Sequence, residues 1–246
     1  MNLNDLQTTW EALGETDPLW AVLSHADKKG GRWAADEFFA TGVREIDALM
    51  KNLGSLGRVP GRRGALDFGC GVGRLTQPLT AHFDEVVGVD LSHEMVRVAQ
   101  FHNRAPERCR FVVNAAPDLA AFATGSFDLV VSYLTLQHMP PRYSTSYLRE
   151  FVRVARTGGV IVVQLPAVPA TLLAALKGPL RSARNSVHAL LARVGIGPGA
   201  RMGMYGVKSR TVRELLHKAG AQLVDVAPAD QYTPGWTGYR YVAVKA

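Results

Sequence analysis

A cluster of glycines followed at a distance by an acid is the first pattern in this sequence that could do chemistry. In "LDFGCGVGRLT", Gly69, Gly71 and Gly73 follow a short apolar run. Glycine adopts backbone angles that other residues avoid, and it lets a ligand approach main-chain atoms. Asp90 ends the next apolar run, 21 residues after Gly69, and an acid at that place commonly binds the hydroxyls of a ribose. The pattern therefore favours a ligand that contains adenosine.

The spacing of the same residues disfavours two other ligand classes. A dinucleotide fingerprint needs Gly-x-Gly-x-x-Gly, and its last position falls on Arg74 when counted from Gly69 and on Thr76 when counted from Gly71. No Gly-Lys-Ser/Thr follows the turn, so the phosphate loop of nucleotide triphosphatases is absent. Glycines that only form a tight turn remain the alternative reading of the motif itself.

The elements that must position these residues alternate between strand and helix. Continuous β-branched runs predict strands that are covered on both faces, and they are separated by helical patterns, the first of them at about 73–82. This order predicts an α/β, Rossmann-like, doubly wound and mostly parallel sheet. The strand-like runs lie at residues 65–68, 85–90, 109–113, 127–133 and 158–165, with two final strands at 221–229 and 238–246.

The segments on either side of this core have their own character. Residues 1–60 read as a helical cap, in which Asp17 can cap a helix that starts at Pro18, and residues 61–246 read as the main domain. Between Ala167 and Lys218 the sequence has nine basic residues and one acid, Glu214, although the whole chain carries only +7. A basic lid inserted at about 167–207, with a helix around 180–194, is therefore expected.

Composition places the chain among globular proteins of the cell interior. It has 246 residues, of which 47% are hydrophobic and 20% charged, and no apolar run is long enough to cross a membrane. The N-terminus does not look like a secretion signal, and two cysteines are too few for a disulfide framework. We therefore expect a cytoplasmic protein. No His and carboxylate cluster has an obvious metal-binding spacing, so no metal is predicted.

Four motifs together identify a family resemblance. "LDFGCGVGRLT", "VVGVDLSHEMVRVA", "SFDLVVSYLTLQHM" and "TGGVIVVQL", in this order, resemble the class I S-adenosylmethionine-dependent methyltransferases. The resemblance covers roughly residues 60–165 and is specific for the cofactor, S-adenosyl-L-methionine, but nearly silent about the acceptor. It implies a seven-stranded sheet whose last strand is antiparallel.

The resemblance also implies roles for individual residues. The methionine end of the cofactor would meet the glycine turn, the ribose would meet the acid after the second strand, and adenine would lie against the residues that follow the second and third strands. The cofactor-binding residues implied in this way are Asp67, Gly69, Gly71, Asp90, Leu91, Met95, Asn114 and Ala115. The segment "GGRWAADEFFATG" is similar to the cap of some bacterial members, where Arg32 would pair with the cofactor carboxylate and Phe39 or Gly42 would face it. The alternative is that these aromatic residues are simply core.

The resemblance and the side-chain chemistry together suggest catalytic residues. Tyr133 and Leu134, after the fourth strand, would line the methyl-transfer pocket. A hydroxyl acceptor must lose a proton, and His138 follows at the same edge of the sheet, where its neutral form could act as a general base. The competing reading is that His138 only supports the cofactor loop, while Gln137 could orient the cofactor or the acceptor.

These observations predict O-methylation of a small molecule or of a sugar or glycan hydroxyl. The alternatives are a nitrogen acceptor, methylation of RNA or protein, and a cofactor-binding module without catalysis. The basic lid could be a solvated surface, could bind an anionic acceptor or could contact a membrane surface peripherally. Nucleic acid is disfavoured as a partner because no separate binding module is visible. The oligomeric state is left open.

Overall fold

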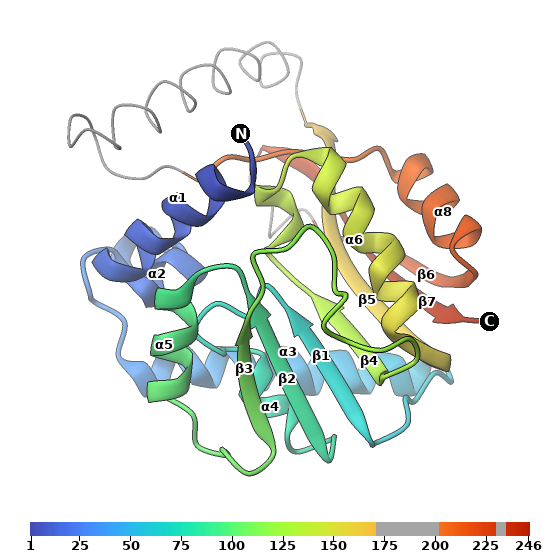
Figure 1. Cartoon of the computed structure of the whole chain (residues 1–246), viewed down its shortest axis with the longest axis horizontal. Helices are drawn as coiled ribbons and strands as arrows, with labels where there is room; N and C mark the ends of the chain where they lie inside the picture. The colour runs from blue at the N-terminus through green and yellow to red at the C-terminus, as the bar shows by residue number, and fades with distance from the viewer. Residues whose placement is uncertain (171–201, 230–234) are drawn as a thin grey trace.

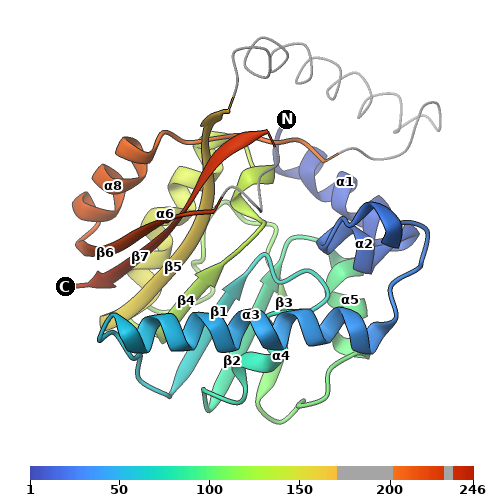
Figure 2. The ribbon, with the colours of Figure 1, turned by 180° about the vertical axis from the view of Figure 1, so that it is seen from behind.

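A mixed sheet forms the centre of the molecule. The computed structural model describes residues 1–170, 202–229 and 235–246, and its seven-stranded sheet has the order β3-β2-β1-β4-β5-β7-β6 (Figures 1 and 2). Strands β1 to β5 pair in parallel, and β7 pairs antiparallel with both β5 and β6. The predicted fold and its antiparallel last strand are confirmed. The strands are β1 (Gly64–Phe68), β2 (Glu85–Asp90), β3 (Cys109–Val113), β4 (Phe127–Ser132), β5 (Ala155–Pro169), β6 (Ala221–Pro228) and β7 (Trp236–Lys245).

Helices cover both faces of this sheet. Helices α3 and α4 lie on one face, in front in Figure 2, while α6 and α8 lie on the opposite face, in front in Figure 1. Helices α1 and α2 lie near the edge at which β1, β2 and β4 end. No helix in the described part of the chain is long and apolar enough to cross a membrane. The helices are α1 (Leu3–Thr16), α2 (Pro18–Val22), η1 (Ala26–Lys28), α3 (Ala35–Ser55), α4 (Thr76–Leu79), α5 (His93–Phe101), η2 (Leu136–His138), α6 (Pro141–Val154) and α8 (Ser209–Lys218).

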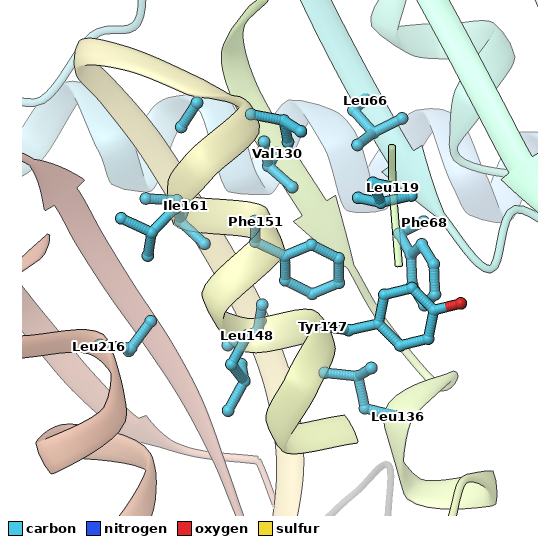
Figure 3. Packing of buried hydrophobic residues seen from close by; sticks show 14 of the residues in the cluster. Leu66, Phe68, Leu119, Val130, Leu136, Tyr147, Leu148, Phe151, Ile161 and Leu216 are labelled. Atoms are coloured by element: carbon cyan, nitrogen blue, oxygen red, sulfur yellow. The ribbon is translucent and has the colours of Figure 1, made fainter. Parts of the chain in front are cut away.

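Strand alternation sends apolar side chains into two cores. On the face toward α3, Ala65, Leu129 and Val162 are fully buried; on the other face, Leu66, Val130 and Ile161 pack under α6 (Figure 3). Phe68 lies against two aromatic rings of α6, with its ring centroid 4.3 Å from that of Tyr147 and 5.0 Å from that of Phe151 (Figure 3). The continuous β-branched runs therefore reflect a sheet that is buried on both sides.

Local details differ from expectation at two places. The helix predicted for about 73–82 is shorter in the structure, as α4 from Thr76 to Leu79; its start is delayed because Gly73 has a φ angle of 84°, outside the α-helical range. Asp17 precedes α2, as predicted, but its side chain does not cap that helix. Its Oδ2 atom instead accepts hydrogen bonds from Gly30 N at 2.6 Å and Gly31 N at 3.0 Å, so it fixes the loop that leads to α3.

Parts of the predicted organisation stay untested. Most of the basic lid at about 167–207, including the helix around 180–194, lies outside the described residues. The division at residue 60 into a cap and a main domain also stays a prediction.

Helix α3 is fastened directly to the glycine turn. A Cβ atom on Gly42 would lie only 1.9 Å from the main-chain oxygen of Arg74, so only glycine allows this approach. The buried Arg74 guanidinium forms an ion pair with Glu45 of α3 at 2.7 Å and donates to Thr41 Oγ1 at 3.4 Å. The end of the turn is therefore held by both packing and charge.

We expect Gly42→Ala to destabilise the protein because its methyl group would push α3 away from the turn. Overpacking of this kind costs about 1–3 kcal/mol of stability. The measurement is the free energy of unfolding of each variant in urea. Gly54→Ala in the same helix is the control, because no atom lies within 4 Å of its added Cβ. Equal stabilities for the two variants would contradict the contact.

Candidate functional site

A cavity of about 570 Å³ lies at the carboxyl ends of β1, β2 and β4. We call it the first cavity. Its wall combines the turn after β1, the end of β2, the loop after β4 and the N-terminal helices. The lining residues are Leu6, Trp10, Ala21, Val22, Leu23, Ser24, His25, Asp67, Gly69, Cys70, Gly71, Arg74, Leu75, Asp90, Leu91, Tyr133, Leu134, Thr135, Gln137, His138, Met139, Met202 and Met204. Most of the sequence-predicted site residues are therefore brought together.

The glycine turn is narrow because neighbouring side chains fill the space beside it. Gly69 has a φ angle of 73°, and an added Cβ would lie 2.0 Å from Thr135 Cγ2. At Gly71 an added Cβ would lie 2.5 Å from Val22 Cγ2. The turn is also bonded in place, since Gly69 N donates to Val89 O at 2.7 Å and Thr135 Oγ1 donates to Gly69 O at 3.1 Å. The glycines therefore serve two purposes: they allow the tight turn, and they let the side chains of Thr135 and Val22 approach its backbone.

Asp90 connects the turn to the next helix. Its carboxylate is 8% exposed; Oδ2 accepts from Gly71 N at 2.9 Å, and Oδ1 accepts from Ser92 N at 3.0 Å. Burial raises the pKa of Asp90, while the hydrogen bonds from the Ser92 and Gly71 amides oppose that shift. Each oxygen keeps a further lone pair that a ligand hydroxyl can use.

Asp67 is the second carboxylate in the wall. It is 2% exposed and accepts a hydrogen bond from Thr76 Oγ1 at 2.6 Å. Burial raises the pKa of Asp67 to about 6. Arg74 also lines the first cavity, but its charge is already paired with Glu45. The acidic side chains of the described wall therefore favour a cationic ligand over one with a phosphate chain.

His138 is buried at the end of the loop after β4. It is 8% exposed, with Nδ1 2.7 Å from Gly203 O and Nε2 3.2 Å from Gln137 Nε2. Burial lowers the pKa of His138, and the hydrogen bond to Gly203 opposes the shift. The ring also makes an edge contact with Trp10, at a centroid separation of 5.3 Å. Both ring nitrogens therefore have partners within the chain.

Four of the predicted cofactor-binding residues do not line the first cavity. Met95 is fully buried on α5, in a cluster with Trp33 and Phe38. Asn114 donates from Nδ2 to Asp118 O at 2.8 Å. Ala115 and Arg32 are exposed residues outside the cavity wall. Phe39 and Gly42, the other cap candidates, also lie outside the cavity wall: Phe39 packs beside Phe38, and Gly42 faces Arg74.

The N-terminal helix is the contribution that the sequence analysis missed. Leu6 and Trp10 line the first cavity, and together with Leu13 they follow the spacing of a helical face. This spacing predicts an apolar helical face, but it does not indicate which part of the molecule that face covers. Met202 and Met204, which precede α8, also line the cavity and carry no motif of their own.

Glu11 anchors this helix to the start of α5. Its carboxylate accepts from Ser92 Oγ at 2.7 Å, from His93 N at 2.8 Å and from Glu94 N at 2.9 Å. Burial alone would raise the pKa of Glu11, but the hydrogen bonds from Glu94, Ser92 and His93 together lower it. A carboxylate at a helix N-terminus is also favoured by the helix dipole. Helix α1 is thus tied to the residues that follow Asp90.

A second cavity of about 410 Å³ adjoins the first. Its wall is formed by α3 and by residues of β5, β6 and β7, and Tyr133 lines both cavities. Its charged lining residues are Arg44, Glu45 and Arg240. The Nε atom of Arg240 and the Oε1 atom of Glu45 are buried and have no hydrogen-bond partner in the described structure. Buried polar atoms of this kind call for a ligand or water.

Within residues 1–170, 202–229 and 235–246, no group of three His, Cys, Asp or Glu side chains is arranged to hold a metal ion.

We expect Glu11→Gln to destabilise the protein at neutral pH by about 1 kcal/mol, because it removes the charge at the start of α5. The lowered pKa of Glu11 means that its contribution is complete above the ordinary value of 4.5 and is lost as the pH falls through the folded-state pKa. Thermal unfolding of wild-type protein and Glu11→Gln across this pH range should show that their difference in stability disappears in acid. Glu15→Gln, an exposed change on the same helix, is the control. A gap that persists in acid would contradict the assignment.

Comparisons with known proteins identify a methyltransferase domain in the chain. A family model for the methyltransferase domain matches residues 66–163. The chain is 34% identical over 115 residues to a ubiquinone biosynthesis O-methyltransferase of Xanthomonas oryzae pv. oryzae, an alignment that covers 46% of this chain and 47% of that protein. The chain is also 30% identical over 164 residues to the protein of the same name from Xanthomonas axonopodis pv. citri. That alignment covers 66% of this chain and 64% of that protein. The chain thus spans about half the length of the first of these relatives.

A solved structure resembles the whole chain. The magnesium protoporphyrin IX methyltransferase of Synechocystis PCC 6803, determined with bound SAH, aligns with a TM-score of 0.62 at 21% identity and covers 98% of both chains. At this identity the likeness establishes the fold. Residues 66–163 are therefore a methyltransferase domain, and the sheet order and the glycine turn agree with the class I S-adenosylmethionine-dependent methyltransferases that the sequence resembles.

Proposed function

We propose that the first cavity binds S-adenosylmethionine and that the chain transfers the methyl group to an oxygen atom of a small molecule. The observation that carries the proposal is the buried Asp90 carboxylate, which lies in the cavity wall beside the glycine turn. There it would accept hydrogen bonds from the two ribose hydroxyls, and Leu91 would offer adenine an apolar surface. When bound, the cofactor supplies an electrophilic methyl group on a sulfonium ion.

The charge of the cavity supports a sulfonium ligand. Asp67 and Asp90 contribute carboxylates, while Arg74 is already paired with Glu45. In the described part of the wall a pyrophosphate would meet these carboxylates, and the one arginine there, Arg74, is paired with Glu45, whereas a sulfonium and an ammonium group are attracted by the carboxylates. We propose that Asp67 lies toward the methionine end of the ligand, as the family resemblance implies.

The chain's main task would be to hold the acceptor in line with the methyl group. Positioning alone lowers such a barrier by about 7–11 kcal/mol in favourable cases. Tyr133 lines both cavities, so we propose that the acceptor occupies the second cavity and reaches the methyl group beside this side chain. The names of the Xanthomonas relatives, both O-methyltransferases, support oxygen as the acceptor atom.

The lining of the second cavity supports an anionic acceptor. Arg44 and Arg240 both contribute to the wall; the guanidinium of Arg240 also pairs with Asp225 at 3.4 Å, but its buried Nε atom has no partner among the described residues. Arginine suits carboxylates because its donors form a planar fork. A carboxylic acid or an acidic phenol also ionises without a strong base, so we favour these acceptors over a sugar hydroxyl.

We propose a cytoplasmic location, which the two buried free cysteines support, since free thiols suit a reducing compartment. Recognition of the acceptor, or of a membrane surface, by the basic lid stays a prediction because most of that segment lies outside the described residues.

The decisive experiment combines cofactor binding with labelled methyl transfer. Asp90→Asn should weaken binding of S-adenosylhomocysteine in calorimetry by about tenfold or more, because a charged acceptor is lost. Asp84→Asn, an exposed change at the other end of β2, is the control. Wild-type protein should transfer labelled methyl from S-adenosylmethionine to small molecules of a metabolite extract. Product that disappears with protease or nuclease treatment, or cofactor binding without any labelled product, would contradict the proposed function.

Arg44→Gln should raise KM for a carboxylate-bearing acceptor by about fivefold and leave KM for the cofactor unchanged, because one exposed charge is removed from the second cavity. Lys51→Gln, at an exposed position on the same helix, is the matched control. Equal effects of the two substitutions on the acceptor KM would argue against the second cavity as the acceptor site.

A further inference from the structure

A chain of buried polar groups connects the loop after β4 to the segment before α8. Gln164 is 1% exposed on β5, in a strand whose neighbours are mostly Val, Ile and Leu, and Gln137 is 4% exposed. Buried amides are retained only where their hydrogen bonds are satisfied. We call the following groups the amide relay: Leu134 N, the side chains of Gln164, Gln137 and His138, and Gly203 O.

The distances define four links in the relay. Leu134 N donates to Gln164 Oε1 at 3.0 Å, and Gln164 Nε2 donates to Gln137 Oε1 at 3.4 Å. Gln137 Nε2 lies 3.2 Å from His138 Nε2, and His138 Nδ1 lies 2.7 Å from Gly203 O.

The two ends of the relay fix its direction. A backbone N–H can only donate, so Gln164 must present its oxygen to Leu134 and its NH₂ group to Gln137. Gln137 must then present its own NH₂ group to His138 Nε2. At the other end a backbone carbonyl can only accept, so His138 Nδ1 must carry a hydrogen. One arrangement satisfies all four links, with a neutral His138 whose Nε2 lone pair accepts from Gln137.

We propose that Gln164 is a positioning residue of the methyl-transfer site: acting through Gln137, it holds His138 as the neutral Nδ1–H tautomer, so that His138 supports the loop after β4 and does not accept a proton. The role of Gln164 at a methyl-transfer site rests on the proposed function, whereas the tautomer of His138 does not. The relay itself is a property of the chain without any ligand.

Protonation of His138 would break the relay at one link or another. A hydrogen on Nε2 would face the NH₂ group of Gln137. Rotating the Gln137 amide would set its NH₂ group against that of Gln164, and rotating Gln164 would leave the Leu134 N–H without an acceptor. In a buried site each lost link leaves a polar group unsatisfied. The groups that face the ring are the indole of Trp10 on α1, the Gln137 amide and the Gly203 carbonyl, and none of these ionises near neutral pH.

The relay also explains two features of the surrounding backbone. Leu134 has a φ angle of 59°, the single positive value recorded among the described non-glycine residues, and the bond to Gln164 holds its N–H in place. On the other side, Tyr205 N donates to Gln137 O at 2.7 Å, and Met202 and Met204 line the first cavity. Through Gln137 and Gln164, a neutral His138 therefore connects the backbone of Leu134 to Gly203, in the part of the cavity wall that precedes α8.

The test is NMR of the imidazole nitrogens of His138 in the full chain without cofactor. Wild-type protein should show the neutral Nδ1–H tautomer at neutral pH and a pKa below the ordinary value of about 6.5. Gln164→Glu should raise the pKa of His138 by about one unit or more, because a carboxylate turns the Gln137 amide around and favours the imidazolium. Gln164→Met should also raise it, because Gln137 becomes free to rotate.

Gln222→Glu, an exposed change on β6, is the charge-matched control and should leave the signal unchanged. An ordinary pKa in wild-type protein, an Nε2–H tautomer, or no change in Gln164→Met would each overturn the proposal. The measurement needs no cofactor, so its failure is distinguishable from failure of the proposed function. That function would instead be tested by labelled methyl transfer, where the pH profile of kcat should show no ionisation that moves with the His138 pKa.

Discussion

The paired hydrogen bonds of Asp90 are the interaction on which the rest of the site depends. One carboxylate oxygen holds the amide of Gly71 in the turn after β1, and the other holds the amide of Ser92 at the start of α5. The Ser92 hydroxyl in turn donates to Glu11 of α1. A single buried acid therefore sets the relative positions of the turn, of α5 and of the N-terminal helices, and the turn and these N-terminal helices contribute to the first cavity.

The sequence analysis succeeded where local pattern and topology act together. Parallel strands end at one edge, so Gly69, Asp90 and Tyr133 had to meet there once the strand–helix alternation was recognised. It did not anticipate Leu6 and Trp10 as lining residues, because the packing direction of a helix is not encoded in its own periodicity. The pairing of Arg32 with the cofactor carboxylate stays a prediction. Nor could it show that Thr135 and Val22, rather than a ligand alone, require the glycines.

The same limit applies to His138. As a motif residue it suggested either a base or a support, and the sequence could not choose, because the deciding partners come from distant segments. Gln164 lies on β5 and Gly203 precedes α8, so only the folded chain brings them to the ring. With both nitrogens bonded, the geometry favours support. An acceptor oxygen that ionises by itself is consistent with that assignment and with the arginines of the second cavity.

The contact between α2 and the glycine turn has a consequence for cooperativity. Val22 fills the space beside Gly71, and Glu11 completes the start of α5, so the first helices and the sheet edge supply groups that each needs from the other. Detaching these helices would expose apolar surface and leave amide groups at the start of α5 without partners. These contacts cross the boundary predicted near residue 60, so we expect the segments on its two sides to unfold together as one thermodynamic unit.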